Sequence, residues 1–277
     1  MSKGFLTIAQ NGQYDYVRMA YVLAMSLKQS QDKYNKLTVV VNQNEEIPEK
    51  YLKVFDKVIY TTKPKEPWKI QNKWRYFWYT PYDETIVLDT DMLFFNDIST
   101  WWECLKDKEI EFTTTTKNYR GETTTSDYYR KVFTSNKLPN LHTALFYFKK
   151  TEEIYKYFQL VMLIFENWEV FYEKFLKTPP KFLSGDVAYA LAAKIFFNRK
   201  WDTFLTFTHM RSRLQDDDIV SDWNKELPSF FTNYHGQIEL KINNFNQLYP
   251  FHYIKKNFLN EEVVEFYEEQ NSLRLLR

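Results

Sequence analysis

Cysteine is almost absent from this 277-residue sequence, which contains Cys104 alone. One cysteine cannot form an intramolecular disulfide, so the sequence excludes a disulfide framework and fits a reducing compartment. Long hydrophobic runs are also missing, because apolar runs such as "LVMLIF" are far too short to cross a bilayer. The opening "MSKGFLTIAQ" lacks the apolar region of a signal peptide. We therefore expect a cytoplasmic protein without a membrane partner.

An excess of charge of either sign is missing as well. The chain has 37 basic and 36 acidic residues, so no global field draws it to nucleic acid or membrane, although a local patch can still do so. There are only five glycines and nine prolines, and no repeat, low-complexity tract or Gly/Ser linker. With 44% hydrophobic residues the chain can bury a large core. We expect one domain over residues 1–277 with a C-terminal extension.

What the sequence does contain is an alternation of strand and helix patterns. Apolar runs rich in β-formers occur in "GFLTIAQN", "LTVVVN", "VFDKVIYT" and "TIVLDTD", with helical patterns at 15–30 and 68–79 between them. Residues 141–150 predict another strand, 151–177 one long or broken helix, and 185–197 a further helix. This order predicts an α/β fold with a mainly parallel sheet, whose ligands collect beyond the carboxyl ends of the strands.

Two carboxylates lie at such an end. Asp89 and Asp91 are one residue apart at the end of a buried strand pattern, so both side chains point to the same side and repel each other. A divalent cation such as Mg²⁺ or Mn²⁺ would cancel that repulsion and could take further ligands from a diphosphate. The plainer alternative is that Asp91 caps a turn and Asp89 accepts backbone hydrogen bonds.

A phosphatase of the haloacid dehalogenase type is a competing hypothesis, because such enzymes also end an apolar strand in Asp-x-Asp and use the first aspartate as nucleophile. That motif normally closes the first strand and is followed by Thr or Val. Here three other strand patterns precede it, and Met92 and Leu93 follow it. The sequence therefore favours the metal-binding interpretation.

Two stretches resemble family-8-type glycosyltransferases of the GT-A fold. "LTIAQNGQYDYVRMAYVLAMSLKQS" is similar to the opening of that family, with matches at Thr7, Ala9, Asn11, Tyr16, Val22, Leu23, Ser26 and Leu27. "NKWRYFWYTPYDETIVLDTDMLFFNDI" resembles the stretch from a nucleotide-contacting lysine to the metal motif, and it aligns that lysine with Lys73. The resemblance implies a nucleoside diphosphate sugar donor, with residues 1–100 as the nucleotide and metal half and 101–277 as the acceptor half. It implies nucleoside-pocket and diphosphate roles for Thr7, Ala9, Asn11, Tyr16 and Lys73.

The C-terminal "PFHYIKKNF" is similar to the family's His-containing signature. It keeps His252 as a third ligand for Mn²⁺ or Mg²⁺, but it has Lys255 where the family has glycine and lacks the following Pro-Trp. Either Lys255 or Lys256 would contact the diphosphate. His209 is the rival third ligand, and Arg211 and Arg213 beside it are alternative phosphate contacts.

The middle of the chain departs from the family pattern. An Asn-Ser-Gly motif is replaced by His142, Thr143 and Ala144, and an Asp-Gln-Asp helix start keeps only Asp186. These departures fall where donor sugar and acceptor are recognised, so neither identity carries over. Asp186 is our candidate for substrate positioning or base catalysis, and a helix N-cap is its structural alternative.

The polar segment 117–137 is expected to be a long irregular insertion after the metal strand, and it interleaves tyrosines with cations. This mixture suits contact with the phosphates and bases of a nucleic-acid acceptor, and an ordinary solvated loop is the plainer alternative. The whole pattern also resembles glycosyltransferases of T-even-type phages, some of which transfer glucose or arabinose to hydroxymethylcytosine in DNA; such a protein would act in the host cytoplasm. A cell-surface glycan acceptor, or a non-catalytic nucleic-acid-binding module, are the alternatives. The candidate DNA phosphate contacts are Arg120, Arg130 and Lys131.

Overall fold

A six-stranded sheet forms the centre of the protein in the computed structural model, which describes residues 1–62, 70–124, 130–209, 229–232, 236–242 and 244–275. The strand order is β3-β2-β1-β4-β7-β6. Strands β1 to β4 pair in parallel, and β7 is antiparallel to both of its neighbours. The predicted α/β class with a mainly parallel sheet is confirmed. The strands are β1 (Lys3–Ala9), β2 (Leu37–Asn42), β3 (Lys57–Thr61), β4 (Glu84–Leu88), β6 (Ile110–Thr113) and β7 (His142–Lys149).

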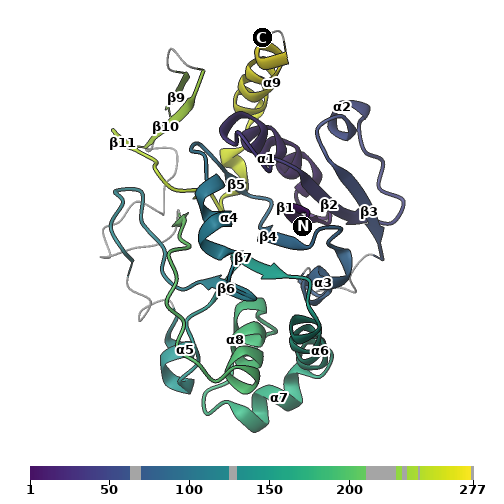
Figure 1. The fold of residues 1–277 in the computed structure, drawn as a ribbon, viewed down its shortest axis with the longest axis vertical. Coiled ribbons are helices and arrows are strands. Elements are labelled where there is room, and N and C mark those ends of the chain that lie inside the picture. Colours follow the sequence, from purple (N-terminus) through teal and green to yellow (C-terminus); the bar gives the residue numbers. More distant parts are fainter. Residues whose placement is uncertain (63–69, 125–129, 210–228, 233–235, 243, 276–277) are drawn as a thin grey trace.

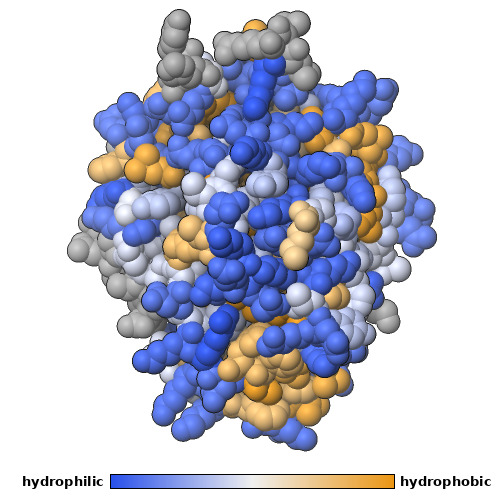
Figure 2. All heavy atoms as spheres, viewed as in Figure 1, coloured by the Kyte–Doolittle hydropathy of each residue, from blue (hydrophilic) through white to orange (hydrophobic). Residues whose placement is uncertain are grey.

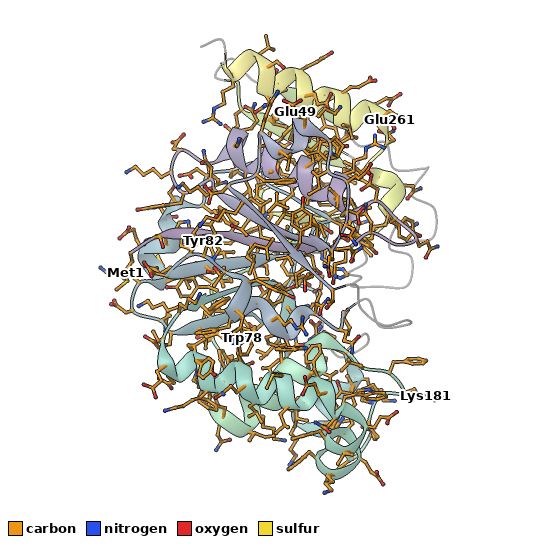
Figure 3. The ribbon with its side chains drawn as sticks, turned by 90° about the vertical axis from the view of Figure 1, so that its right-hand side faces the viewer. Met1, Glu49, Trp78, Tyr82, Lys181 and Glu261 are labelled. Atoms are coloured by element: carbon orange, nitrogen blue, oxygen red, sulfur yellow. The ribbon has the colours of Figure 1, made fainter. Side chains whose placement is uncertain are left out.

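Helices cover both faces of this sheet, as Figures 1 and 3 show. One layer contains α1 (Tyr16–Ser30), α2 (Glu49–Leu52), α4 (Ser99–Leu105) and α9 (Glu261–Leu275). The other contains α3 (Tyr76–Tyr79), α5 (Lys131–Asn136), α6 (Glu152–Glu166), α7 (Trp168–Phe175) and α8 (Gly185–Phe196).

The two cores follow from the alternation of side chains along each strand. Phe5 of β1 packs into the core under α1 and α9, whereas the next residue, Leu6, packs into the core under α6 and α8. Val39 and Val40 of β2 divide in the same way, and all four side chains are fully buried. Strands covered on both faces need continuous apolar runs, which is why they were visible in the sequence.

Two predicted segments differ from the structure. The helix expected from residue 68 is a 3₁₀ turn (Lys73–Arg75) followed by α3, and residues 63–69 lie outside the described part. The helical pattern 151–177 was expected as one long or broken helix, and it is broken at Asn167 into α6 and α7. The polar segment 117–137 is not irregular throughout, because its end forms α5.

Two smaller sheets carry the C-terminal part. β5 (Met92–Leu93), β12 (Phe251–His252) and β8 (Thr208–His209) form one, in which His252 pairs with Met92 on one side and His209 on the other. The second contains β9 (Ser229–Thr232), β10 (Ile238–Ile242) and β11 (Phe245–Asn246). The first sheet matters most, because it brings His252 to the residues that follow β4.

The surface in Figure 2 is mostly hydrophilic, with a hydrophobic area at its lower end near α7 and α8. Exposed apolar side chains of that region are Val170, Phe175, Phe182 and Ile195. Within the described residues, no helix combines the length and the apolar character that a membrane span requires.

Candidate functional site

Three potential metal ligands converge where β4 ends. Oxygen atoms of Asp89 and Asp91 and a ring nitrogen of His252 all lie within 4.8 Å of one another. Nε2 of His252 is 3.1 Å from Oδ2 of Asp91 and 3.9 Å from Oδ2 of Asp89. The site is fixed by backbone hydrogen bonds, because Asp89 N donates to Ala144 O at 2.9 Å and Tyr253 N donates to Asp91 O at 3.0 Å.

This group fits a hard divalent cation. Two carboxylates and an imidazole are ligands that Mg²⁺ and Mn²⁺ accept. Neighbouring ligands around an octahedral Mg²⁺ lie about 3 Å apart, because each bond is about 2.0–2.1 Å long. The 3.1 Å separation between His252 and Asp91 matches that spacing.

A lysine pairs with each aspartate. Nζ of Lys73 donates to Oδ1 of Asp89 at 2.7 Å, and Nζ of Lys256 donates to Oδ2 of Asp91. Burial lowers the pKa of Lys73, but the Asp89 carboxylate outweighs it and holds that pKa above its ordinary value. Burial raises the pKa of Asp91, but His252 and Lys256 outweigh it and hold the pKa below its usual range. Lys73 is therefore a cation at the metal group, and Lys256 forms an ion pair with Asp91.

Two cavities meet at this group. The small cavity, of about 310 Å³, is lined by Ile8, Gln10, Tyr16, Ile70, Lys73, Asp89, Thr90, Asp91, His252, Ile254 and Lys256. The large cavity, of about 690 Å³, shares Ile70, Lys73, Asp89 and His252 with it and extends to His142, Asp186, Arg130 and His209. A ligand that fills both cavities would pass directly over the potential metal ligands.

Of the predicted nucleoside-pocket residues, some line the small cavity and others stabilise the backbone next to it. Tyr16 lines the small cavity, whereas the side chains of Thr7 and Ala9 are fully buried and are absent from its described lining. Thr7 Oγ1 donates to Leu88 O at 2.8 Å and so fixes the end of β4. Asn11 supports the start of α1, because its Oδ1 accepts from Val17 N at 3.0 Å.

Ile8 and Gln10 line the small cavity, and they lie on the face of the chain opposite to that of Thr7 and Ala9. Any contact of Thr7 or Ala9 with a nucleoside would come from backbone atoms. Strand alternation could have pointed to Ile8 and Gln10, because the buried Thr7 and Ala9 share the other face.

Asp186 faces the same large cavity as the metal group, although it is about 100 positions away in the sequence. Its Oδ1 accepts from Thr143 N at 2.9 Å and Thr143 Oγ1 at 2.5 Å, and its Oδ2 accepts from Arg130 at 2.6 Å. Burial raises its pKa, but Arg130, His142 and Thr143 outweigh this and hold the pKa below the usual range. The N-cap alternative is wrong, since Ser184 caps α8.

The position of Arg130 contradicts its predicted role as a DNA phosphate contact. Its side chain is only 13% exposed, and besides Asp186 it donates to Asn140 Oδ1 and Leu141 O. It is part of the cavity wall rather than a free surface cation. Arg120 and Lys131 are exposed, and Arg120 Nε donates to Tyr119 Oη at 2.8 Å. The sequence had no signal for the Arg130–Asp186 pair, because the two residues are 56 positions apart.

The structure also places the residues between which the sequence left a choice, the two lysines and the two histidines. Lys256, not Lys255, lines the small cavity among the described residues. His209 lies beside His252, with ring centroids 5.5 Å apart, but it is outside the three-residue metal group. Burial and the neighbouring His252 lower the pKa of His209 well below its ordinary value. Arg211 and Arg213 lie outside the described residues.

Comparisons with protein-family models and with curated proteins give no match. The structure is similar to the galactosyltransferase LgtC in complex with donor and acceptor sugar analogues, with a TM-score of 0.50 and 10% identity over 98% of this chain and 95% of that one. Mouse xyloside xylosyltransferase 1 has a TM-score of 0.47 and 10% identity, over 81% of this chain and 90% of that one.

GlyE of Streptococcus pneumoniae TIGR4 has a TM-score of 0.46 and 10% identity over 98% of this chain. The chain spans 60% of GlyE and 38% of the bifunctional glycosyltransferase WbbM. At these identities the likeness concerns the fold, which is the GT-A fold with a central, mostly parallel sheet flanked by helices.

Proposed function

We propose that the protein is a metal-dependent glycosyltransferase that uses a nucleoside diphosphate sugar, with UDP as the expected nucleoside diphosphate. The observation that carries this proposal is the position of Asp89, Asp91 and His252 at the junction of two cavities. The small cavity suits the nucleoside, and the large cavity suits the donor sugar and the acceptor. A diphosphate between them would lie at the metal group and at both lysines.

The reaction breaks the bond between the anomeric carbon and the diphosphate oxygen, and the electron pair stays on the diphosphate. The acceptor oxygen forms the new bond to that carbon and releases its proton, which the departing diphosphate or solvent takes up. Bound Mn²⁺ or Mg²⁺, held by Asp89, Asp91 and His252, would stabilise the leaving group's charge. Lys73 and Lys256 are placed to exchange their carboxylate partners for diphosphate oxygens and add to that stabilisation.

Asp186 is proposed to orient sugar or acceptor hydroxyls. Its pKa is held below the usual range, and a carboxylate that binds protons weakly is a poor general base at neutral pH. Its fixed hydrogen bonds keep the carboxylate in one position in the large cavity. Positioning is therefore the better supported of its two predicted roles.

Hydroxymethylcytosine in DNA remains our proposed acceptor, with a cell-surface glycan as the alternative. This acceptor is supported by the resemblance of the sequence to glycosyltransferases of T-even-type phages. Arg130 adds no support, because its guanidinium is occupied within the protein. The test is incubation with Mn²⁺, a panel of UDP-sugars and duplex DNA containing hydroxymethylcytosine, followed by mass analysis of the digested nucleosides. Donor hydrolysis without any added hexose or pentose would exclude the DNA acceptor and leave the glycan.

The metal-dependent donor site is tested by Asp91→Asn, which keeps the shape of the side chain but removes its charge. We expect Mn²⁺-dependent binding of UDP, measured by calorimetry, and donor hydrolysis to collapse while thermal unfolding stays cooperative. Asp107→Asn is the matched control, because Asp107 is exposed and lies outside the described lining of both cavities. Wild-type metal dependence in Asp91→Asn would show that the site is misplaced. Absence of any donor turnover in the wild type would favour a binding module.

A further inference from the structure

A third cavity, which we call the basic cavity, lies beside the large one. Its volume is about 590 Å³, and the ends of α5 and α8 with the segments that follow form most of its wall. Figure 1 shows these two helices next to each other, and Lys194 Nζ joins them by donating to Asn136 O at 3.0 Å. Thr114 and Asn140 line both the basic and the large cavity. A ligand in one therefore reaches the wall of the other.

Charge distinguishes the basic cavity from the rest of the chain. Its described lining contains Lys137, Lys194, Arg199 and Lys200 but no carboxylate, although acidic and basic residues are nearly equal in number overall. Arg199 is partly compensated, because it donates to Ile110 O at 2.9 Å and lies 3.5 Å from Glu111 Oε2. Lys137 and Lys200 are exposed, and neither forms an ion pair within the described chain.

Helix stabilisation explains only part of this charge. Cations near a helix C-terminus interact favourably with the last carbonyl groups, and Lys194 does this for α5. Lys137 caps the same helix with its backbone N–H, in a left-handed conformation with φ of 51° that glycine or asparagine would adopt at lower cost. Lys200 lies four residues beyond α8. The side chains of Lys137 and Lys200 are left for a ligand.

We propose that the basic cavity binds phosphates of a polynucleotide acceptor while the reacting unit of that acceptor enters the large cavity. The inference rests on the proposed glycosyltransferase function and names the acceptor's chemistry. Cations spread around a cavity of this size match a chain of repeated phosphates better than a single anion. Trp201 also lines it, and the Arg199 guanidinium lies 4.2 Å from its ring centroid, so an aromatic surface accompanies the charge.

The test compares two double variants with the same loss of charge. Lys137→Gln/Lys200→Gln removes the two unpaired cations of the cavity, and Lys33→Gln/Lys57→Gln removes two exposed lysines elsewhere. Binding of a fluorescent single-stranded oligonucleotide with hydroxymethylcytosine is measured by anisotropy at several salt concentrations. For the cavity variant, we expect the slope of log affinity against log salt to become shallower by about 1.4, since each lost phosphate contact contributes about 0.7. The control variant should keep the wild-type slope.

Two further measurements decide between outcomes. A peptide nucleic acid of the same sequence has no phosphates and should not compete, nor should a neutral oligosaccharide. A wild-type slope in the cavity variant, or an equal change in the control variant, would overturn the proposal. Donor hydrolysis should be unchanged in both variants. If the wild type lacks donor turnover but its oligonucleotide binding depends on the cavity lysines, the glycosyltransferase proposal fails and the phosphate site stands.

Discussion

Arg130→Met removes the guanidinium that pairs with Asp186 while keeping an unbranched side chain. Asp186 would then be left charged at the cavity wall, with Thr143 as its remaining hydrogen-bond donor among the described residues. Breaking a fully buried pair costs about 3–5 kcal/mol. The two side chains are 13% and 28% exposed, so water compensates part of this loss and we expect about 2–3 kcal/mol. At roughly 2–4 °C per kcal/mol for a chain of this size, the midpoint of thermal unfolding should fall by roughly 4–12 °C.

Urea unfolding of four proteins isolates the pair: the wild type, Arg130→Met, Asp186→Asn and the double variant. If the ion pair carries the loss, the double variant should be more stable than the sum of the single effects by at least about 1 kcal/mol. Arg130→Met should leave the salt dependence of oligonucleotide binding unchanged, because the guanidinium is occupied inside the protein. Additive effects within about 0.5 kcal/mol would refute the structural role given to Arg130.

Three further predictions concern the core, acid stability and turnover. Gly4→Ala should cost about 1–3 kcal/mol, because a Cβ would overlap the Tyr82 ring; an equal cost in a Tyr82→Leu background would contradict this. Burial, with Arg130, lowers the pKa of His142 to about 3, so the unfolded chain takes up the proton first as pH falls below 6.5. Between pH 8 and pH 5, the free energy of unfolding of His142→Gln, measured in urea, should therefore fall by about 2 kcal/mol less than that of the wild type. Equal decreases in the two proteins would contradict this prediction. Asp186→Ala should lower the turnover number about 10- to 100-fold, and an unchanged turnover number would remove Asp186 from the chemistry.

The parallel part of the sheet was predictable mainly because three of its strands, β1, β2 and β4, are buried on both faces. "LTVVVN" is β2, all of whose residues are buried, and no other element type suits such a short β-branched run. The pattern could not give the direction of β7, because a buried strand reads the same in either orientation. The direction becomes evident only from the pairing of β7 with β4, in which Leu145 lies opposite Leu88, and the sequence alone does not show this pairing.

The metal group was partly predictable for a related reason. Asp89 and Asp91 follow a strand whose end is evident, so local alternation places them together. The choice between His252 and His209 depends on two-residue strands that pair His252 with Met92, 160 positions earlier, and with His209, 43 positions earlier. Such pairing has no local signal. In contrast, the alternation of side chains along β1 could have shown which of its faces lines the small cavity. The resemblance to the family led to Thr7 and Ala9, whereas the lining residues are Ile8 and Gln10.

The arrangement of charge at the metal group leads to a last prediction. Two carboxylates, Asp89 and Asp91, already have two ammonium partners, Lys73 and Lys256. A divalent cation that binds alone must enter beside these ammonium groups, and a diphosphate that binds alone meets the carboxylates. When both bind, the lysines can turn to the diphosphate and leave the carboxylates to the metal. Mn²⁺ and UDP should therefore bind cooperatively, each raising the affinity of the other at least about fivefold.

Calorimetry with Mn²⁺ alone, UDP alone and the two together measures this coupling. In Lys256→Met, Mn²⁺ alone should bind more tightly, because a repelling charge is gone from Asp91, while UDP should bind more weakly and the coupling should shrink. Lys255→Met is the matched control, since its side chain is outside the described lining of the small cavity. The charge argument predicts opposite signs for the two ligands, which a general loss of structure would not produce. Equal Mn²⁺ affinity with and without UDP, or weaker Mn²⁺ binding in Lys256→Met, would show that the lysines do not compete with the metal.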